Sequence, residues 1–210
     1  MNVGLFVAAA LLLDVVLWIL VLVGRESVVI PAEFARTHQP AFVFPYSHGL
    51  AAALAWSVLA AAVAWAACAR HPGLRGRAAV LTAAAVFSHW LLDALVHRPE
   101  MPLAGAGSAV VGLSLWDRMP VALLVEAAVL AAGLLLFVRG AGLSRGRALA
   151  FTAAVLVVLV FTVVGMTIAP PPPSAHAMAA TSLATIVAVC ALIGWLGRPS
   201  AATPVVRADA

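Results

Sequence analysis

The stretch AAVLTAAAVFSHWLLDALVH, residues 78–97, decides the fold of this chain. It has the length, about 20 residues, that an α-helix needs to cross roughly 30 Å of hydrocarbon. His89, Asp93 and His97 interrupt it at four-residue spacing, which stacks them along one face of a helix. Ionisable groups at membrane depth are costly and are seldom incidental. The stretch therefore predicts a membrane helix with one polar face.

The rest of the chain is equally apolar. Hydrophobic residues make up 65% of the 210 residues and charged residues only 10%, and the mean hydropathy is +1.12. This exceeds what a soluble core would bury. Apolar runs of about 20 residues begin near positions 3, 47, 78, 119, 148 and 177. We expect an all-α polytopic membrane protein, a bundle of about six transmembrane helices forming one domain over residues 1–198, with a disordered tail at 199–210.

The basic residues predict the orientation of this bundle. All twelve are arginine, and two short loops hold half of them: Arg70, Arg75 and Arg77 after the second run, and Arg139, Arg145 and Arg147 after the fourth. The positive-inside rule places these loops and both termini in the cytoplasm, and the connections 24–46, 98–118 and 169–176 outside. The net charge of +4 then reflects topology and contact with anionic membrane lipids. It does not indicate a nucleic-acid surface.

Combining orientation with helix rise gives each polar residue a depth. At about 1.5 Å per residue, Asp93 lies roughly 6 Å and His89 roughly 12 Å below the outer surface. Asp14 and Glu126 fall at comparable depths on the first and fourth helices. His48 follows Pro45, which suits the first turn of the second helix. The rim is expected to hold Glu26, Glu100, Asp117 and His176, with His38 and His71 in solvated loops.

These residues form a plausible ligand set for a metal ion. Two imidazoles and one or two carboxylates suit zinc, or manganese or iron if more oxygen ligands join. His89 and Asp93, four residues apart, can share one ion. His48 supplies a third ligand, Asp14 or a water a fourth, and His97 is a further candidate. An open position on such a metal acidifies bound water, so hydrolysis is a reasonable reaction, with Asp14 or Glu126 as the general base.

Other interpretations stay open on the sequence alone. A buried aspartate can pair with an arginine, and a histidine at a helix start can be an interfacial or capping residue. A small transporter can use the same acids and histidines to relay protons or bind a cation. A haem carrier needs histidines facing each other across a flat cofactor, and a lipid-binding or assembly module needs only small-residue helix faces. The oligomeric state is open for the same reason.

Two short motifs resemble a known family. The elements YSHGL at residues 46–50 and SHWLLD at residues 88–93 resemble the bacterial membrane-bound metal-dependent hydrolases, which include LexA-regulated inner-membrane proteins. Their pattern is a Thr-His-Ser element followed, one helix later, by His-x-x-x-Asp. The resemblance implies His48, His89 and Asp93 as site residues, a divalent metal, and a multi-pass protein of the bacterial inner membrane.

The resemblance covers mainly residues 14–126, and it has one clear departure. The family's usual His-Arg pair falls at positions 43 and 44, where this chain has Val43 and Phe44. The function we expect is a metal-dependent membrane hydrolase with an outward-facing site, acting on a lipid or another membrane-associated substrate. The main alternative is the proton- or cation-coupled transporter.

Overall fold

The computed structural model describes residues 2–198, so the tail expected at 199–210 lies outside the described residues. The described chain is 70% helical with almost no sheet. Seven helices follow the apolar runs of the sequence: α1 (Val3–Ala10), α2 (Leu12–Leu22), α4 (Leu50–Ala67), α5 (Pro72–Val96), α6 (Met119–Gly140), α7 (Arg145–Thr167) and α8 (Ala175–Leu196). The prediction of a helical chain with several membrane-length segments is confirmed.

The number of spanning helices depends on how α1 and α2 are counted. Five helices are long and apolar enough to cross a membrane, with α6 extended to Leu115 by the short helix before it. The axes of α1 and α2 differ by 52° across the break at Leu11, and this bent pair makes a sixth span if it crosses as one. The sequence predicts one continuous helix here, whereas the structure breaks it just before Asp14.

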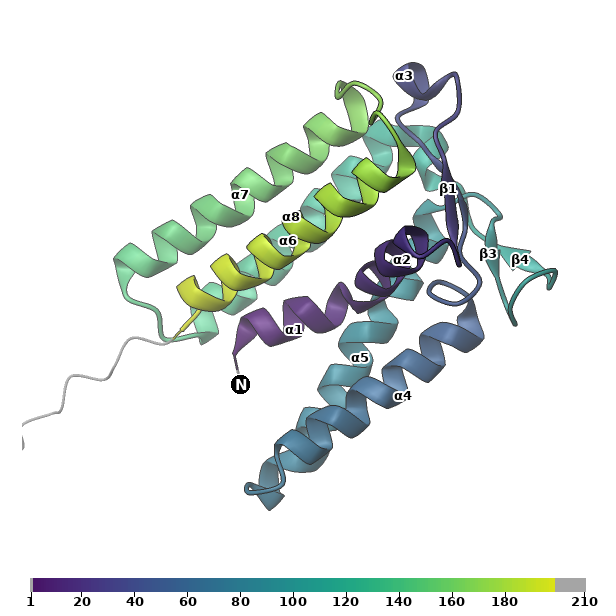
Figure 1. Ribbon diagram of the computed structural model, residues 1–210. Coiled ribbons are helices and arrows are strands. Elements are labelled where there is room, and N and C mark those ends of the chain that lie inside the picture. Colours follow the sequence, from purple (N-terminus) through teal and green to yellow (C-terminus); the bar gives the residue numbers. More distant parts are fainter. Residues whose placement is uncertain (1, 199–210) are drawn as a thin grey trace, which may run out of the picture.

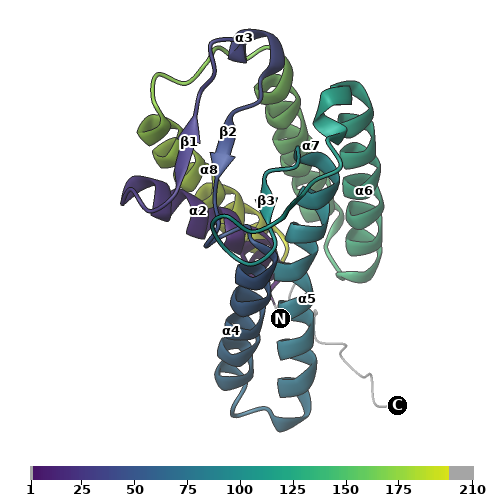
Figure 2. The ribbon, with the colours of Figure 1, turned by 90° about the vertical axis from the view of Figure 1, so that its right-hand side faces the viewer.

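The helices form two arms that meet at one end of the molecule (Figure 1). The hairpin of α4 and α5 is one arm, and α6, α7 and α8 are the other. In Figure 2 the hairpin of α4 and α5 extends downward, away from α6, α7 and α8. The first helix joins the arms, because α1 packs against both α5 and α8. Its contact with α8 is close: a Cβ on Gly4 would overlap the backbone of Gly194, so only glycine permits this approach.

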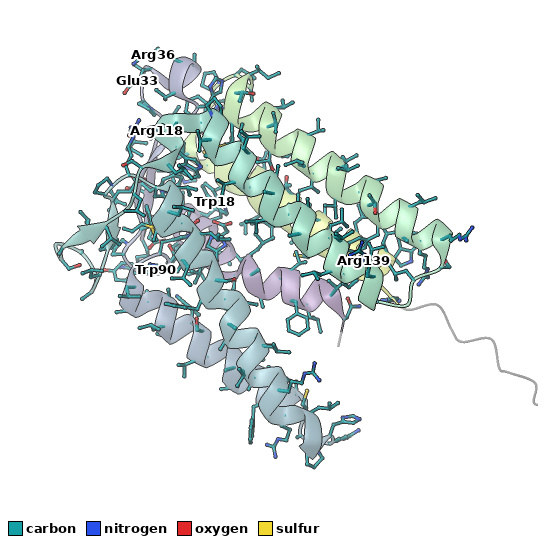
Figure 3. The ribbon with its side chains drawn as sticks, turned by 180° about the vertical axis from the view of Figure 1, so that it is seen from behind. Trp18, Glu33, Arg36, Trp90, Arg118 and Arg139 are labelled. Carbon is teal, nitrogen blue, oxygen red and sulfur yellow. The ribbon has the colours of Figure 1, made fainter. Side chains whose placement is uncertain are left out.

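The long connections all lie at the end where the arms meet. They contain two antiparallel ribbons, β1 (Ser27–Val29) with β2 (Ala41–Val43) and β3 (Met101–Pro102) with β4 (Val110–Val111), the short helix α3 (Phe34–Thr37), and the 3₁₀ helix η1 (Leu115–Arg118). The sequence patterns do not predict these ribbons. We call this end, with its ribbons, the site end. Figure 3 shows Arg118 near it and Arg139 at the opposite end of α6.

One glycine lets the β4 connection cap helix α5. Gly112 has φ +150° and a Cβ there would overlap the carbonyl of Arg98, so a larger residue would push this segment away. Because the segment lies close, Leu113 N–H donates to Ala94 O at 2.9 Å and Ser114 N–H donates to His97 O at 2.8 Å. These bonds satisfy carbonyls that a helix end leaves free.

The most deeply buried side chains also gather towards the site end. Leu13, Val86 and Met101 are fully buried, and Phe44 and Trp18 pack in the same cluster. They come from two helices and two connections, so this core ties α2 and α5 to the ribbons. Elsewhere many large apolar side chains are exposed, as expected for helices surrounded by lipid.

The first prediction concerns orientation. Asn2 and Gly194 are hydrogen-bonded (3.1 Å), so both ends of the described chain lie together, far from the site end. With Cys68 and Cys190 replaced by alanine, Pro173→Cys should react with an impermeant thiol reagent on intact cells, because the arginine loops hold the other end inside. Gly73→Cys, at the turn between α4 and α5, should react only after permeabilisation. The reverse pattern would place the site end in the cytoplasm.

Candidate metal centre

Four polar side chains converge where α2, the turn before α4, and α5 meet. The Nε2 atoms of His48 and His89 face each other at 3.4 Å. Asp93 Oδ2 lies 3.2 Å from His48 Nε2 and 3.1 Å from His89 Nε2. Asp14 Oδ1 lies 3.6 Å and 3.7 Å from the same two nitrogens. The structure thus brings together four of the residues that the sequence offers for a site.

The spacing of these atoms suits one metal ion. Asp14, His48 and His89 each offer a ligand atom, and these atoms lie within 4.8 Å of one another. A tetrahedral ion with bonds of about 2.0–2.1 Å has ligand–ligand edges of about 3.3–3.4 Å. The five distances given above scatter around that value. The ligand atoms of His48 and His89, together with the carboxylate oxygen of Asp14 or of Asp93, can therefore surround a metal ion here with little movement.

Three local features position the ligands. Asp14 lies in the first turn of α2, where the bend creates a new helix N-terminus whose dipole favours a carboxylate. His89 and Asp93 lie one turn apart on α5, as their spacing predicts. His48 was expected in the first turn of a helix, but the structure places it in a tight turn before the N-cap Gly49, with its N–H bonded to Phe44 O at 3.1 Å.

His48 is held by a hydrogen-bonded chain that ends on a buried carboxylate. Its Nδ1 lies 2.8 Å from Ser47 Oγ, and Ser47 Oγ donates to Glu26 Oε2 at 2.7 Å. Because the serine proton points to Glu26, the hydroxyl oxygen accepts from a protonated Nδ1. When the imidazole is neutral, this leaves the lone pair of Nε2 directed at the cluster, which is the tautomer that a metal-binding histidine needs.

Glu26 and Trp90 fix this chain from both sides. Glu26 Oε1 accepts the N–H groups of Tyr46 at 2.7 Å and Ser47 at 2.9 Å, which secures the turn. Trp90 Nε1, on the helix that carries His89, donates to His48 O at 2.9 Å. Ser47 holds the Nδ1 atom of His48, and Trp90 holds its backbone carbonyl. The ring therefore has little freedom to rotate.

Asp93 Oδ2 depends on the two imidazoles for a hydrogen bond. It is buried, and the Nε2 atoms of His48 and His89 lie about 3 Å away and can donate to it only when they are protonated. Among the described residues its ion-pair partners are His48 and His89 and no arginine, so a simple Asp–Arg pair does not explain it. With neutral imidazoles whose Nε2 atoms carry no proton, the buried carboxylate oxygen has no donor, which is costly, and a cation at the centre of the cluster would remove that cost.

The carboxylates also determine the protonation of His48. Burial lowers the pKa of His48, but the hydrogen bonds and charges of Asp14 and Asp93 outweigh burial and raise the pKa to about 9. At neutral pH the metal-free cluster therefore holds a proton between its carboxylates. A metal ion must displace this proton to bind Nε2.

His97 is not part of the ligand group. Helix α5 ends at Val96 and His97 has extended backbone (φ −66°, ψ 152°), so the face that carries His89 and Asp93 does not continue to it. Its Nδ1 pairs with Glu100 Oε1 at 2.8 Å, and its ring lies against Trp116 at 4.3 Å between centroids. It still lines the cavity of about 200 Å³ that borders the cluster.

Glu126 lies on α6 and is not among the atoms that converge. It lines another cavity, of about 330 Å³, together with His89 and Asp93. Of the two residues that the sequence offers as the general base, only Asp14 lies against both imidazoles. Its position therefore suits that role better than the position of Glu126 does.

Two residues that the sequence places at the rim or in a solvated loop are buried in the structure. Glu26 is only 4% exposed and holds the turn of His48. His38 is 8% exposed and packs on the ring of Phe34. No spacing rule connects residue 26 with residue 47, because the β1–β2 ribbon brings them together. The one available signal was an isolated acid between two apolar stretches.

Comparisons of the chain with protein-family models, with curated proteins and with solved structures find no match.

The second prediction tests the chain that orients His48. In Glu26→Gln the amide oxygen can still accept from the turn, but the amide nitrogen donates to Ser47 Oγ. The serine must then donate to His48 Nδ1, which moves the imidazole proton to Nε2. We expect the zinc affinity, measured by competition with a chromophoric chelator, to fall about 10- to 100-fold. Glu100→Gln, which alters the partner of His97, should leave it unchanged. Equal affinities for both variants and the parent would contradict this role.

The third prediction follows from the raised pKa of His48. Since the proton is bound below about pH 9, the apparent zinc affinity should rise by up to about tenfold per pH unit between pH 7 and 9. The folded pKa exceeds the ordinary 6.5, so the metal-free protein is stabilised by this proton at low pH and loses that stability as pH rises through 9. Its melting temperature should fall over this range. A zinc affinity independent of pH would contradict the displacement of a proton.

Proposed function

We propose that this protein is a metal-dependent hydrolase of the membrane, with His48, His89 and Asp93 as the metal ligands. The observation that carries the proposal is the convergence of two imidazole nitrogens and a carboxylate oxygen within 3.1–3.4 Å of one another. The family resemblance of the two motifs that contain these residues supports it.

The charges of the cluster support a divalent ion. Asp14 and Asp93 together carry two negative charges, and two neutral histidines add none. A divalent cation among them gives a site without net charge, which is the form least costly to bury. Two nitrogen ligands with only one or two carboxylate ligands favour zinc over manganese or iron, which take more oxygen ligands.

The residues around the cluster suit hydrolysis. When bound, a divalent metal supplies an acidified water and a Lewis acid for a carbonyl or phosphoryl oxygen. Asp14 lies slightly farther from the imidazoles than Asp93 does, and it is more exposed, with 28% of its side chain accessible against 15%. Asp14 is thus the carboxylate placed to accept a proton from water in the adjoining cavity. His97 lines the same cavity and can bind the substrate.

The distribution of ionisable residues favours a hydrolase over a proton-coupled transporter. In the described helices, the stretches between the cluster and the arginine-bearing end contain no further Asp, Glu or His. A proton relay across the membrane needs such groups along its path. A hydrolytic site needs them only at one depth, which is where they lie. We place this protein in the bacterial inner membrane on the family resemblance.

The fourth prediction tests the hydrolase directly. Asp93→Asn keeps the size of the side chain but removes the anionic ligand, so bound zinc and hydrolysis should each fall at least tenfold. Protein in vesicles of phosphatidylethanolamine and phosphatidylglycerol is assayed by mass spectrometry for released acyl or headgroup products. Asp117→Asn, which breaks an exposed ion pair with Arg98, is the control and should keep both properties. A metal-free parent protein that carries protons across the vesicle membrane would contradict the proposal and support the transporter.

A further inference from the structure

A large apolar cavity begins beside the cluster formed by Asp14, His48, His89 and Asp93. The cavity of about 330 Å³ that Glu126 lines runs between α5 and α6, and His89, Asp93 and Trp116 line both it and the smaller cavity at the cluster. Away from these residues and Glu126 its walls are apolar, with Leu92 and Val96 from α5 and Val125 and Val129 from α6. Any molecule that fills it touches two of the proposed ligands.

A second apolar cavity continues in the same direction. It has a volume of about 450 Å³ and lies among α1, α6, α7 and α8. Val129 and Leu130 line both cavities, so the two adjoin. Every residue that lines the second cavity is apolar. The two together are polar at the cluster and apolar along the remaining length.

The residues of α6 that line these cavities follow one side of the helix. Ala122, Val125, Glu126, Val129 and Leu130 line the first cavity, and Val129, Leu130, Gly133, Leu134 and Phe137 line the second. We call the space along them the α6 groove. From Ala122 to Phe137 the helix rises roughly 22 Å. One leaflet of a bilayer contributes roughly half of its 30 Å hydrocarbon thickness. The α6 groove is therefore long enough for the hydrocarbon chain of one lipid.

The α6 groove is also open where a lipid would enter. Val125 and Val129 are 37% and 53% exposed although they line it, and α5 and α6 diverge away from the site end (Figure 1). A Cβ on Gly133 would meet no atom within 4 Å. Since these residues belong to a membrane-length helix, the surroundings that reach the groove are lipid chains rather than water.

We propose that the α6 groove binds the hydrocarbon chain of a lipid substrate and places the bond to be hydrolysed beside His89 and Asp93. The proposal rests on the proposed function for its reaction, but the groove can be tested separately. The adjoining cavities, their apolar walls and their length identify the substrate as a long-chain lipid of the leaflet at the site end. A water-soluble substrate would leave about 22 Å of apolar groove unused.

The test uses phosphatidylglycerol with a diazirine near the end of one palmitoyl chain, mixed into the vesicles that hold the full-length protein. Phe151 and Ile193 line the inner part of the α6 groove and are only 4% and 5% exposed, so surrounding lipid does not reach them. Leu136, on the same helix as the groove, is 73% exposed and reports contact with surrounding lipid. After irradiation, mass spectrometry should find the label on Phe151 or Ile193 as well as on the Leu136 face.

Two variants separate occupation of the groove from general labelling. Gly133→Trp should fill the open space and reduce labelling of Phe151 and Ile193 at least tenfold, with the labelling at Leu136 and the zinc content unchanged. Val129→Trp fills the junction of the cavities and should do the same. Gly165→Trp is the matched control, because a Cβ there also meets nothing within 4 Å but Gly165 lines neither cavity.

The outcomes distinguish this proposal from the proposed function. Absence of label on Phe151 and Ile193, or labelling that both tryptophan variants leave unchanged, would overturn the α6 groove as a lipid site whether or not zinc binds. Labelling that the variants abolish, in a protein that binds no metal, would support the lipid site and contradict the hydrolase.

Discussion

The burial of two carboxylates against two imidazoles is the constraint on which the rest of the structure depends. In a chain with so few charged residues, this cluster of Asp14, His48, His89 and Asp93 gathers charge where the surroundings offer little solvation. The buried Oδ2 of Asp93 lies against the Nε2 atoms of His48 and His89, which donate to it only when they are protonated. The divalent cation that we propose would neutralise the carboxylates and, once it has displaced the proton of His48, would bind the Nε2 atoms of both imidazoles, so the geometry and the charge count favour the same ligand.

The connections at the site end, rather than the helices, supply the support of this cluster. The β1–β2 ribbon brings Glu26 to the turn that carries His48, and the β4 segment caps the end of α5 beside His97. The helices supply His89, Asp93 and Asp14, and below the cluster they diverge and leave the α6 groove. A rigid polar end and an apolar groove thus adjoin, an arrangement suited to a substrate that is polar at one end and apolar along its chain.

Part of this arrangement was predictable from the sequence, for physical reasons. His89 and Asp93 share a face because helix periodicity is local, and Asp14 reaches the same depth because rise per residue is constant. His48 was identified through Pro45, although the turn differs from the expected helix start. The contact between Glu26 and Ser47 is not predictable from the sequence, since the β1–β2 ribbon brings them together and no fixed residue spacing connects them. His97 was expected to continue the α5 face, but the helix ends one residue earlier.

X-ray absorption spectroscopy of the purified protein, after equilibration with zinc and removal of excess metal, tests the central claim most directly. The account predicts about one zinc per chain with a first shell of nitrogen and oxygen at about 2.0–2.1 Å and the scattering pattern of two imidazoles. Protein that retains no zinc, or zinc whose first shell contains no imidazole, would contradict the assignment of His48 and His89 as ligands.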